Sequence, residues 1–152
     1  MVTRQMQSHV WLAVERVAAA RPAIDESGTG VLLTARAEGF VVGRPDLAET
    51  IRRLQAYAAV GADCLYAPRL ESVDQARAIV EAVAPAPVNL LVNAPFVTVA
   101  EVAELGVRRI SVGGTLARAA WGGWLGVARE IAEEGTFHGF RDLPDVEGLQ
   151  RR

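Results

Sequence analysis

Residues 31–67 read VLLTARAEGFVVGRPDLAETIRRLQAYAAVGADCLYA. The stretch opens with an apolar run at residues 31–33, which is typical of a strand buried on both faces. A loop containing glycine and proline follows, and Asp46 stands as a cap or first-turn acid before a helical pattern at residues 47–60. Gly61 ends the helix, and residues 64–67 form a second short apolar run. The stretch therefore predicts a strand, a crossover helix and another strand.

The same unit recurs along the rest of the chain. Further predicted strands at residues 88–92 and 109–112 alternate with predicted helices at residues 72–83, 98–105 and 115–134. Ser72 and Thr98 are the predicted caps of the first two of these helices. One helix at residues 10–23, with Ser8 as its cap, precedes the first strand. Parallel strands need crossover connections, which these helices provide. The pattern predicts an α/β fold with a parallel sheet.

The number of units limits the architecture. A closed barrel needs eight such units in roughly 250 residues, whereas about four are visible in this chain. We therefore expect a partial, half TIM-type barrel of about four parallel strands over residues 1–137, preceded by one helix. Residues 138–152 mix glycine, proline and charges, and we expect them to form a loosely packed tail. An open sheet exposes two edges unless another chain covers them.

Composition excludes several classes of protein. The 152 residues are 51% hydrophobic and 22% charged, with a formal net charge of -2, which is typical of a globular protein. No basic surface predicts a nucleic-acid partner, and no apolar run reaches the length that spans a membrane. All 16 basic residues are arginine, so lysine chemistry is excluded. The lone Cys64 leaves no intramolecular disulfide. We expect a cytoplasmic protein.

A charged pair lies at the end of the first predicted strand, which starts in the apolar run 31–33 and closes on residues 34–37. Arg36 and Glu38 come just after the apolar run, where parallel-sheet proteins place their chemistry. The planar fork of Arg36 suits a carboxylate or phosphonate, and the alternative is a structural ion pair with Glu38. Two residues apart, the side chains face the same side if the strand continues. Glu38 would then orient Arg36 or hydrogen-bond a metal-bound water, or else remain a solvated acid.

Several segments together carry a family resemblance that covers about residues 14–137. They occur in order and are Thr34-Ala35-Arg36, Val42-Gly43-Arg44-Pro45-Asp46, Gly61-Ala62-Asp63, Leu65-Tyr66-Ala67-Pro68, Pro87-Val88-Asn89 and residues 105–113. The ordered set resembles the isocitrate lyase and phosphoenolpyruvate mutase superfamily. The resemblance implies a barrel of parallel strands, a bound magnesium ion and a 2-oxo or 2-hydroxy carboxylate substrate. It also implies making or breaking a carbon–carbon or carbon–phosphorus bond.

The resemblance further implies that this chain covers only the carboxy-terminal half of the family's barrel. It resembles the part that begins in the helix after the fourth strand, so the Asp-rich loop and acidic motif that hold magnesium have no counterpart. Magnesium requires several oxygen ligands, which Glu38 alone cannot supply. We expect no metal to bind this chain alone, and lyase or mutase activity only when the other half is supplied.

The resemblance assigns roles to individual residues. In the family an Arg at the position of Arg36 contacts substrate, and an Asn stands near Asn93 in the carbon–carbon lyases. The alternative for Asn93 is an ordinary turn residue. Mutase-like and methylisocitrate-lyase-like relatives place a His or Glu after the second strand, whereas this sequence has Pro68. The difference weakens the assignment of this chain to either of these two groups. Gly113, with Gly114, would bind an anionic substrate group at a helix start, or would simply form a tight turn.

The last predicted helix carries Trp121 and Trp124 on an apolar face. The resembled family commonly exchanges its last helix between subunits, so these tryptophans would anchor a neighbouring copy in a homo-oligomer. Packing within one chain is the alternative. Two other functions stay open from the residues: a non-catalytic remnant or assembly module, and a small phosphate or nucleotide binder that uses Gly113 and Gly114. His9 and His138 are too isolated to form a site.

Overall fold

The computed structural model describes residues 4–149. It divides into a first unit that ends at Val112 and a second unit that begins at Gly113. The first unit contains a sheet of four parallel strands in the order β1-β2-β3-β4. Its elements are α1 (Arg4–Ser27), β1 (Thr34–Arg36), α2 (Leu47–Ala59), β2 (Cys64–Tyr66), α3 (Val73–Val83), β3 (Val88–Leu91), α4 (Val99–Glu104) and β4 (Arg109–Ser111). The predicted α/β class and parallel sheet are confirmed.

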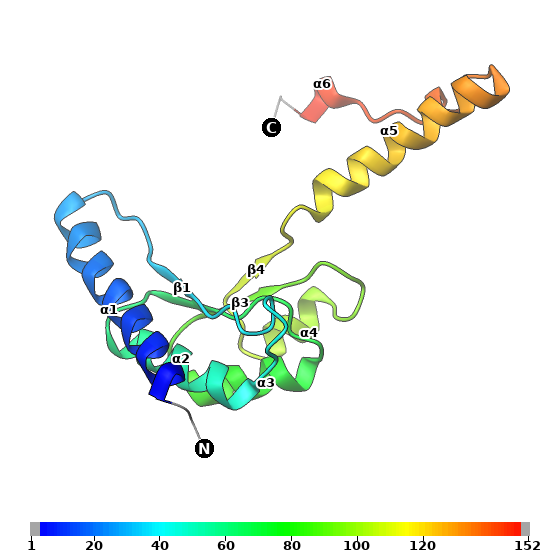
Figure 1. Ribbon diagram of the computed structural model, residues 1–152. Coiled ribbons are helices and arrows are strands. Elements are labelled where there is room, and N and C mark those ends of the chain that lie inside the picture. Colours follow the sequence, from blue (N-terminus) through cyan, green and yellow to red (C-terminus); the bar gives the residue numbers. More distant parts are fainter. Residues whose placement is uncertain (1–3, 150–152) are drawn as a thin grey trace. The chain divides into compact units, whose positions relative to one another are not determined.

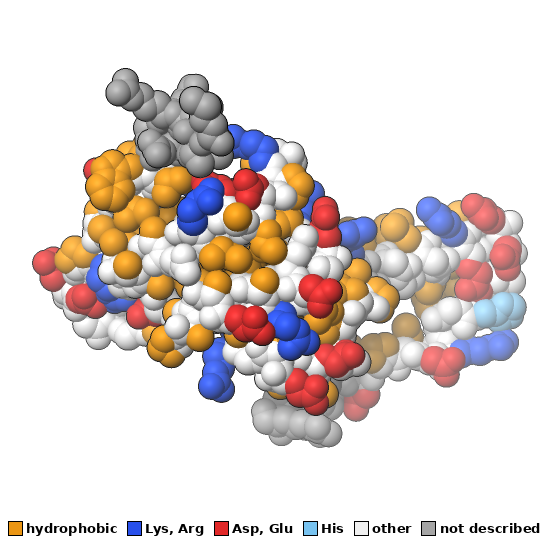
Figure 2. Space-filling model, turned by 90° about the horizontal axis from the view of Figure 1, so that it is seen from below, with side chains coloured by type: hydrophobic (Ala, Val, Ile, Leu, Met, Phe, Trp, Pro, Cys, Tyr) orange, Lys and Arg blue, Asp and Glu red, His pale blue; other side chains and the backbone are white. Residues whose placement is uncertain are grey.

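The helices of the first unit cover one face of this sheet (Figure 1). Ala35, Leu65 and Val88 are matched across the first three strands and are buried under the helices. Leu54 of α2 and Ile79 of α3 are fully buried against them. Burial of these side chains removes apolar surface from water, which is the main term that holds the helices to the sheet. Seen from below, Figure 2 shows acidic and basic side chains interspersed among apolar ones.

Local capping explains where three of the helices begin. Asp46 caps α2 by accepting a hydrogen bond from Glu49 N at 2.9 Å. Ser72 caps α3 in the same way, through Gln75 N. Thr98 and Glu101 form a capping box at the start of α4, in which each side chain accepts a hydrogen bond from the other's backbone N–H. All three caps confirm the sequence prediction.

The first strand differs from the prediction. The sequence predicts a buried strand that starts in the apolar run 31–33 and closes at residues 34–37; Val31 and Leu32 are instead 58% and 71% exposed, and β1 spans Thr34–Arg36, so only the end of the predicted strand is confirmed. The chain joins the sheet at Leu33, whose carbonyl accepts hydrogen bonds from the backbone N–H groups of Asp63 and Cys64. Pairing with β2 begins at the next residue, Thr34. An apolar run locates a strand only approximately, because pairing partners decide where it starts.

The first helix is longer than the sequence pattern indicates. It spans Arg4–Ser27 and includes Pro22, so Ser8 lies inside the helix and does not cap it. Arg21 anchors this helix to the turn before β2, because its guanidinium donates to Asp63 Oδ2 at 2.7 Å and to Gly61 O at 3.3 Å. Backbone donation from Leu33 and the Arg21 guanidinium lower the pKa of the Asp63 carboxyl.

The second unit consists of α5 (Thr115–Glu134), the 3-10 turn His138–Phe140 and α6 (Val146–Leu149). The prediction of a helix at residues 115–134 is confirmed. Glu130 of α5 accepts hydrogen bonds from Thr136 Oγ1 at 2.6 Å and from Gly139 N at 2.9 Å. The Thr136 hydroxyl and these backbone donors hold the pKa of Glu130 below its ordinary value. The start of the expected loose tail is therefore bound to α5.

No helix of the described residues is long and apolar enough to cross a lipid bilayer.

Candidate functional site

The face of the sheet away from the helices carries polar side chains. Register places Arg36, Tyr66, Asn89 and Arg109 opposite one another on β1 to β4. In a parallel sheet, residues matched in register project from the same face. We call this set the polar row. Arg36 and Arg109 are exposed, Tyr66 is half-buried and Asn89 is buried.

Arg36 lies at the end of β1 and is held by two neighbours. Its Nε lies 2.6 Å from Glu38 Oε1, and its Nη2 donates to Glu38 Oε2 at 3.1 Å. Its guanidinium carbon also lies 5.3 Å from the centre of the Tyr66 ring, a cation–π geometry. Arg36 and Glu38 therefore face the same side, as the strand spacing predicts, and the expected ion pair is present. Both side chains stay about half exposed, at 47% and 48%, so solvent and ligands can reach them.

Asn89 of β3 connects this strand to β4 through a side-chain hydrogen bond. Its Nδ2 donates to Ser111 Oγ at 2.9 Å. Its Oδ1 is buried and has no hydrogen-bond partner among the residues that the structure describes. A buried acceptor without a donor costs free energy, and Arg109 occupies the neighbouring register position.

The other predicted residues are placed as follows. Asn93 is exposed in the loop after β3. Gly113 begins the second unit with a φ of 54°, and Gly114 caps α5 without a side-chain hydrogen bond. Cys64 is buried, and burial raises the pKa of its thiol. The roles of Arg36, Glu38, Asn93 and Gly113 toward a substrate stay predictions.

Sequence reasoning missed two members of the polar row, Tyr66 and Arg109. Both stand in predicted strands, where every second residue shares a face with its neighbours. The signal was the alternation within β2 and β4, but the sequence does not show which residues of different strands are matched. Register is decided by packing of the opposite face on the helices.

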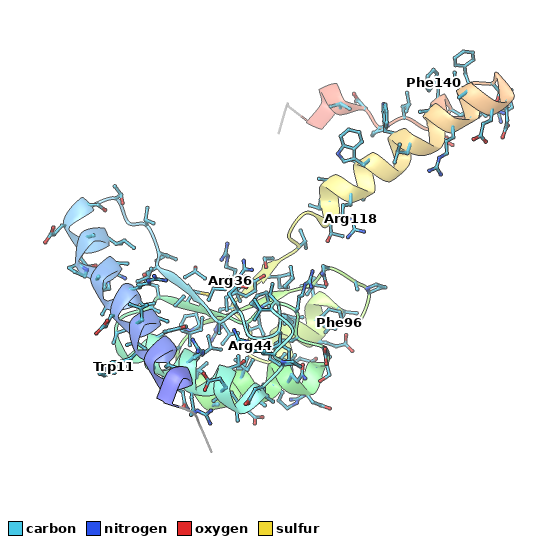
Figure 3. The ribbon with its side chains drawn as sticks, in the orientation of Figure 1. Trp11, Arg36, Arg44, Phe96, Arg118 and Phe140 are labelled. Atoms are coloured by element: carbon cyan, nitrogen blue, oxygen red, sulfur yellow. The ribbon has the colours of Figure 1, made fainter. Side chains whose placement is uncertain are left out.

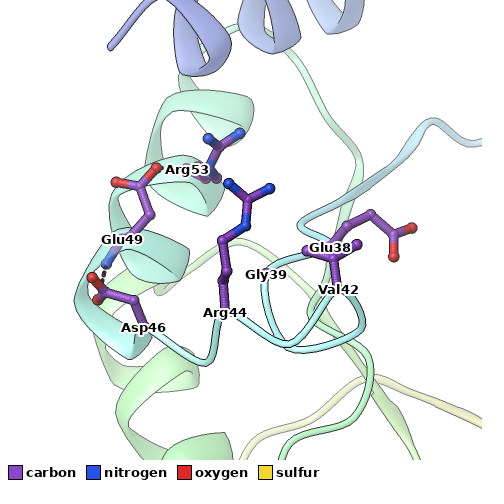
Figure 4. A pocket seen from close by; sticks show the side chains of 7 residues that line it. All are labelled: Glu38, Gly39, Val42, Arg44, Asp46, Glu49 and Arg53. Atoms are coloured by element: carbon purple, nitrogen blue, oxygen red, sulfur yellow. Dashed lines mark hydrogen bonds and ion pairs between the residues drawn. The ribbon is translucent and has the colours of Figure 1, made fainter. Parts of the chain in front are cut away.

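A cavity of about 300 Å³ lies where the β1–α2 loop meets the start of α2 (Figure 4). Its lining combines acidic and basic side chains: Glu38, Gly39, Val42, Arg44, Asp46, Glu49 and Arg53. The loop is fixed by backbone hydrogen bonds, among them Arg44 N to Gly39 O at 2.9 Å. Figure 3 shows Arg36 on the strand and Arg44 in the loop that follows it. Glu38 lines the cavity and also binds Arg36.

The donors on the polar face do not fit a magnesium ion. Magnesium prefers six oxygen ligands, of which proteins supply one or more carboxylates. Glu38 is the carboxylate beside Arg36, and both of its oxygens bind that guanidinium. Across the described part of the chain, no three His, Cys, Asp or Glu residues are grouped so that they could hold a metal ion.

Comparison with known proteins identifies the family. The family model for phosphoenolpyruvate phosphomutase matches residues 2–132. No curated protein matches the chain. A solved structure from Burkholderia cenocepacia J2315, provisionally described as a lyase/mutase, is 42% identical with a TM-score of 0.84. The match covers 91% of this chain and 50% of that chain.

Two further structures extend this likeness. Phosphonopyruvate hydrolase in complex with oxalate and Mg²⁺ is 27% identical with a TM-score of 0.69, and the match covers 90% of this chain and 49% of that one. A 2,3-dimethylmalate lyase, described as a member of the PEP mutase/isocitrate lyase superfamily, shares the fold at 21% identity, a TM-score of 0.77, and 93% and 50% coverage.

The chain spans about half the length of these proteins. Its four parallel strands with their helices therefore form a partial TIM-type barrel, as the sequence predicts. Magnesium is present in one of the related structures. The chain belongs to the phosphoenolpyruvate mutase/isocitrate lyase superfamily.

Proposed function

We propose that this chain supplies the carboxylate-binding half of an enzyme that cleaves or rearranges a bond in a small 2-hydroxy or 2-oxo acid. The observation that carries the proposal is the position of Arg36 at the end of β1, half exposed on a face that no helix of the first unit covers. A guanidinium at this edge of a parallel sheet suits a carboxylate, which it binds through two parallel hydrogen bonds.

The surrounding residues of this chain have distinct roles in the proposal. Glu38 positions the Arg36 guanidinium, because it holds Nε and one hydrogen of Nη2 and leaves Nη1 and the second hydrogen of Nη2 available to a ligand. The Tyr66 ring supports the same guanidinium from one side. Asn93, exposed at the end of β3, offers an amide donor to a substrate oxygen.

The bond-breaking step requires groups that these residues do not include. Magnesium supports the family's chemistry, and its ligands would have to come from another polypeptide segment, since the described residues offer no such group. A carbon–carbon lyase and a phosphonomutase both remain within the proposal. Without the complementing half, the chain should bind a carboxylate but should not turn it over.

Reconstitution tests this function. The chain would be mixed or co-expressed with the part of the Burkholderia relative that it does not match, since it covers 50% of that protein. Turnover of small 2-hydroxy and 2-oxo acids would be assayed with magnesium and with a chelator. We expect magnesium-dependent turnover that Arg36→Ala lowers by about 100-fold or more, because a charge-assisted bidentate contact is lost. An assembled complex without turnover, or an unaffected Arg36→Ala complex, would refute the proposal.

A second function, an assembly module, is favoured by the surface of α5. No described residue of α5 is buried, and Trp121 and Trp124 are each 60% exposed. Their rings pack edge to face at a centroid distance of 5.4 Å, which creates one apolar patch. Exposed aromatic patches are typical of protein interfaces. In this proposal a second copy of the chain covers the patch and makes a homo-oligomer.

A further inference from the structure

Among the charged side chains that line the cavity beside the β1–α2 loop, Arg44 lacks an ionic partner in the described part of the chain. Three carboxylates line the cavity, but each already has partners. Glu38 binds Arg36, and Asp46 accepts the backbone N–H of Glu49 at 2.9 Å. Glu49 binds Arg52 and Arg53, each at 2.8 Å.

The two cavity arginines are less well compensated. Arg53 uses its Nε for Glu49, which leaves its terminal nitrogens without a carboxylate among the described residues. Arg44 makes no ion pair with any side chain that the structure describes. Figure 4 shows the Arg44 guanidinium directed toward that of Arg53, while the Glu38 carboxylate is turned away from both. Two like charges that face each other repel unless an anion lies between them.

The loop geometry makes this arrangement a built feature. Backbone hydrogen bonds from Val41 N and Val42 N to Glu38 O, at 2.9 and 3.1 Å, close the loop before Arg44. A Cβ on Gly39 would lie 3.0 Å from Arg44 O, so the backbone passes too closely for a larger residue. The loop therefore fixes the position from which Arg44 extends.

We propose that this cavity is an oxyanion-binding site, in which Arg44 and the terminal nitrogens of Arg53 bind a carboxylate or a phosphate-type group. Guanidinium groups bind both through paired hydrogen bonds. The volume of about 300 Å³ admits a small ligand. Glu38 separates this site from Arg36, so the two anion sites adjoin but use different arginines. The inference does not depend on turnover by an assembled enzyme.

The experiment uses the full chain and records the Nε–Hε NMR signals of its arginines. The probes are oxalate and inorganic phosphate, titrated separately, with calorimetry for affinity. We expect the Arg44 and Arg53 signals to shift with at least one probe. The variant Arg44→Gln should weaken this binding by about tenfold or more, since a charge-assisted contact is removed. The matched control is Arg77→Gln, an exposed arginine on α3 outside the cavity.

The outcomes separate the two anion sites. Response to oxalate alone identifies a carboxylate site, and response to phosphate alone identifies a phosphate-type site. Either supports the inference if Arg44→Gln weakens the binding by about tenfold or more while Arg36→Gln does not. Binding that only Arg36→Gln removes would overturn the cavity site while leaving the proposed function intact. Equal losses in Arg44→Gln and Arg77→Gln, or no shift of the two cavity arginines, would also overturn it.

Discussion

At the scale of single residues, Asp63 joins three segments of the first unit. Its Oδ2 accepts hydrogen bonds from Leu33 N and from Arg21 Nη1, both at 2.7 Å. These contacts attach α1 and the beginning of β1 to the turn before β2. Because the contacts favour the ionised form, the pKa of Asp63 is lowered. A carboxylate with a lowered pKa stabilises the fold above its unfolded-state pKa and loses this effect as the pH falls through its folded-state pKa.

The variant Asp63→Asn should therefore lose stability in a pH-dependent way. At pH 7 we expect the Tm to fall by about 2–5 °C, a modest value because the side chain is partly exposed to solvent. As the pH falls from the ordinary aspartate pKa of about 3.9 through the lowered folded-state pKa of Asp63, the two proteins should converge. Thermal melts at several pH values measure this, and Glu81→Gln, an exposed change on α3, is the control. A Tm difference that is independent of pH would contradict the prediction.

At the scale of elements, the turn between α2 and β2 depends on Gly61. Its φ is +95°, a conformation that residues with a Cβ rarely adopt. A Cβ at this position would also lie 2.9 Å from Arg21 Cδ and 3.0 Å from Arg21 Cγ. The glycine thus lets α1 approach the turn closely enough for Arg21 to reach Asp63.

Comparison of Gly43 with Gly61 separates the cost of backbone strain from the cost of the clash with Arg21. Gly43 has a φ of +72° but no atom within 4 Å of an added Cβ. We expect Gly43→Ala to lower the Tm by about 2–4 °C through backbone strain alone. Gly61→Ala should lower it about twice as much, because Arg21 must also move. Equal shifts in thermal denaturation would show that the contact with Arg21 adds nothing.

At the scale of the whole molecule, self-association is the prediction that follows from α5. The double variant Trp121→Ala/Trp124→Ala removes the apolar patch and should weaken association by about tenfold or more, as for aromatic residues at interfaces. Sedimentation over a range of concentrations measures the association. The control is Trp11→Ala, an equally exposed tryptophan of α1 at 69%. A wild-type chain that stays monomeric throughout would contradict the prediction.

The four-stranded sheet of the first unit resembles half of a barrel and leaves two strand edges unpaired in the described part of the chain. Each strand and helix is formed locally, and the helices bury one face of the sheet within the first unit. β1 and β4 each pair on one side only in the described part of the chain, so the sheet has two open edges. The unpaired backbone N–H and C=O groups of an edge strand must be paired with another segment, or the edge must be protected from pairing with other chains. This requirement supports the reconstitution experiment over an assay of the chain alone.

By itself, the sequence determined the alternation of strands and helices, the caps at Asp46, Ser72 and Thr98, and the bounds of α5. These features depend on residues close together in the chain, where periodicity and side-chain-to-backbone hydrogen bonds act. The sequence also indicated Arg36 and Glu38 as a pair, because two residues of one strand separated by one position share a face.

Only the tertiary structure decided which strands are matched in register and which distant side chains meet. It showed that the first strand begins at Thr34 and not in the apolar run 31–33, because pairing with β2 fixes its start. It placed the Tyr66 ring against the Arg36 guanidinium. Such contacts depend on how helices and sheet pack together, and packing is a property of segments far apart in the chain.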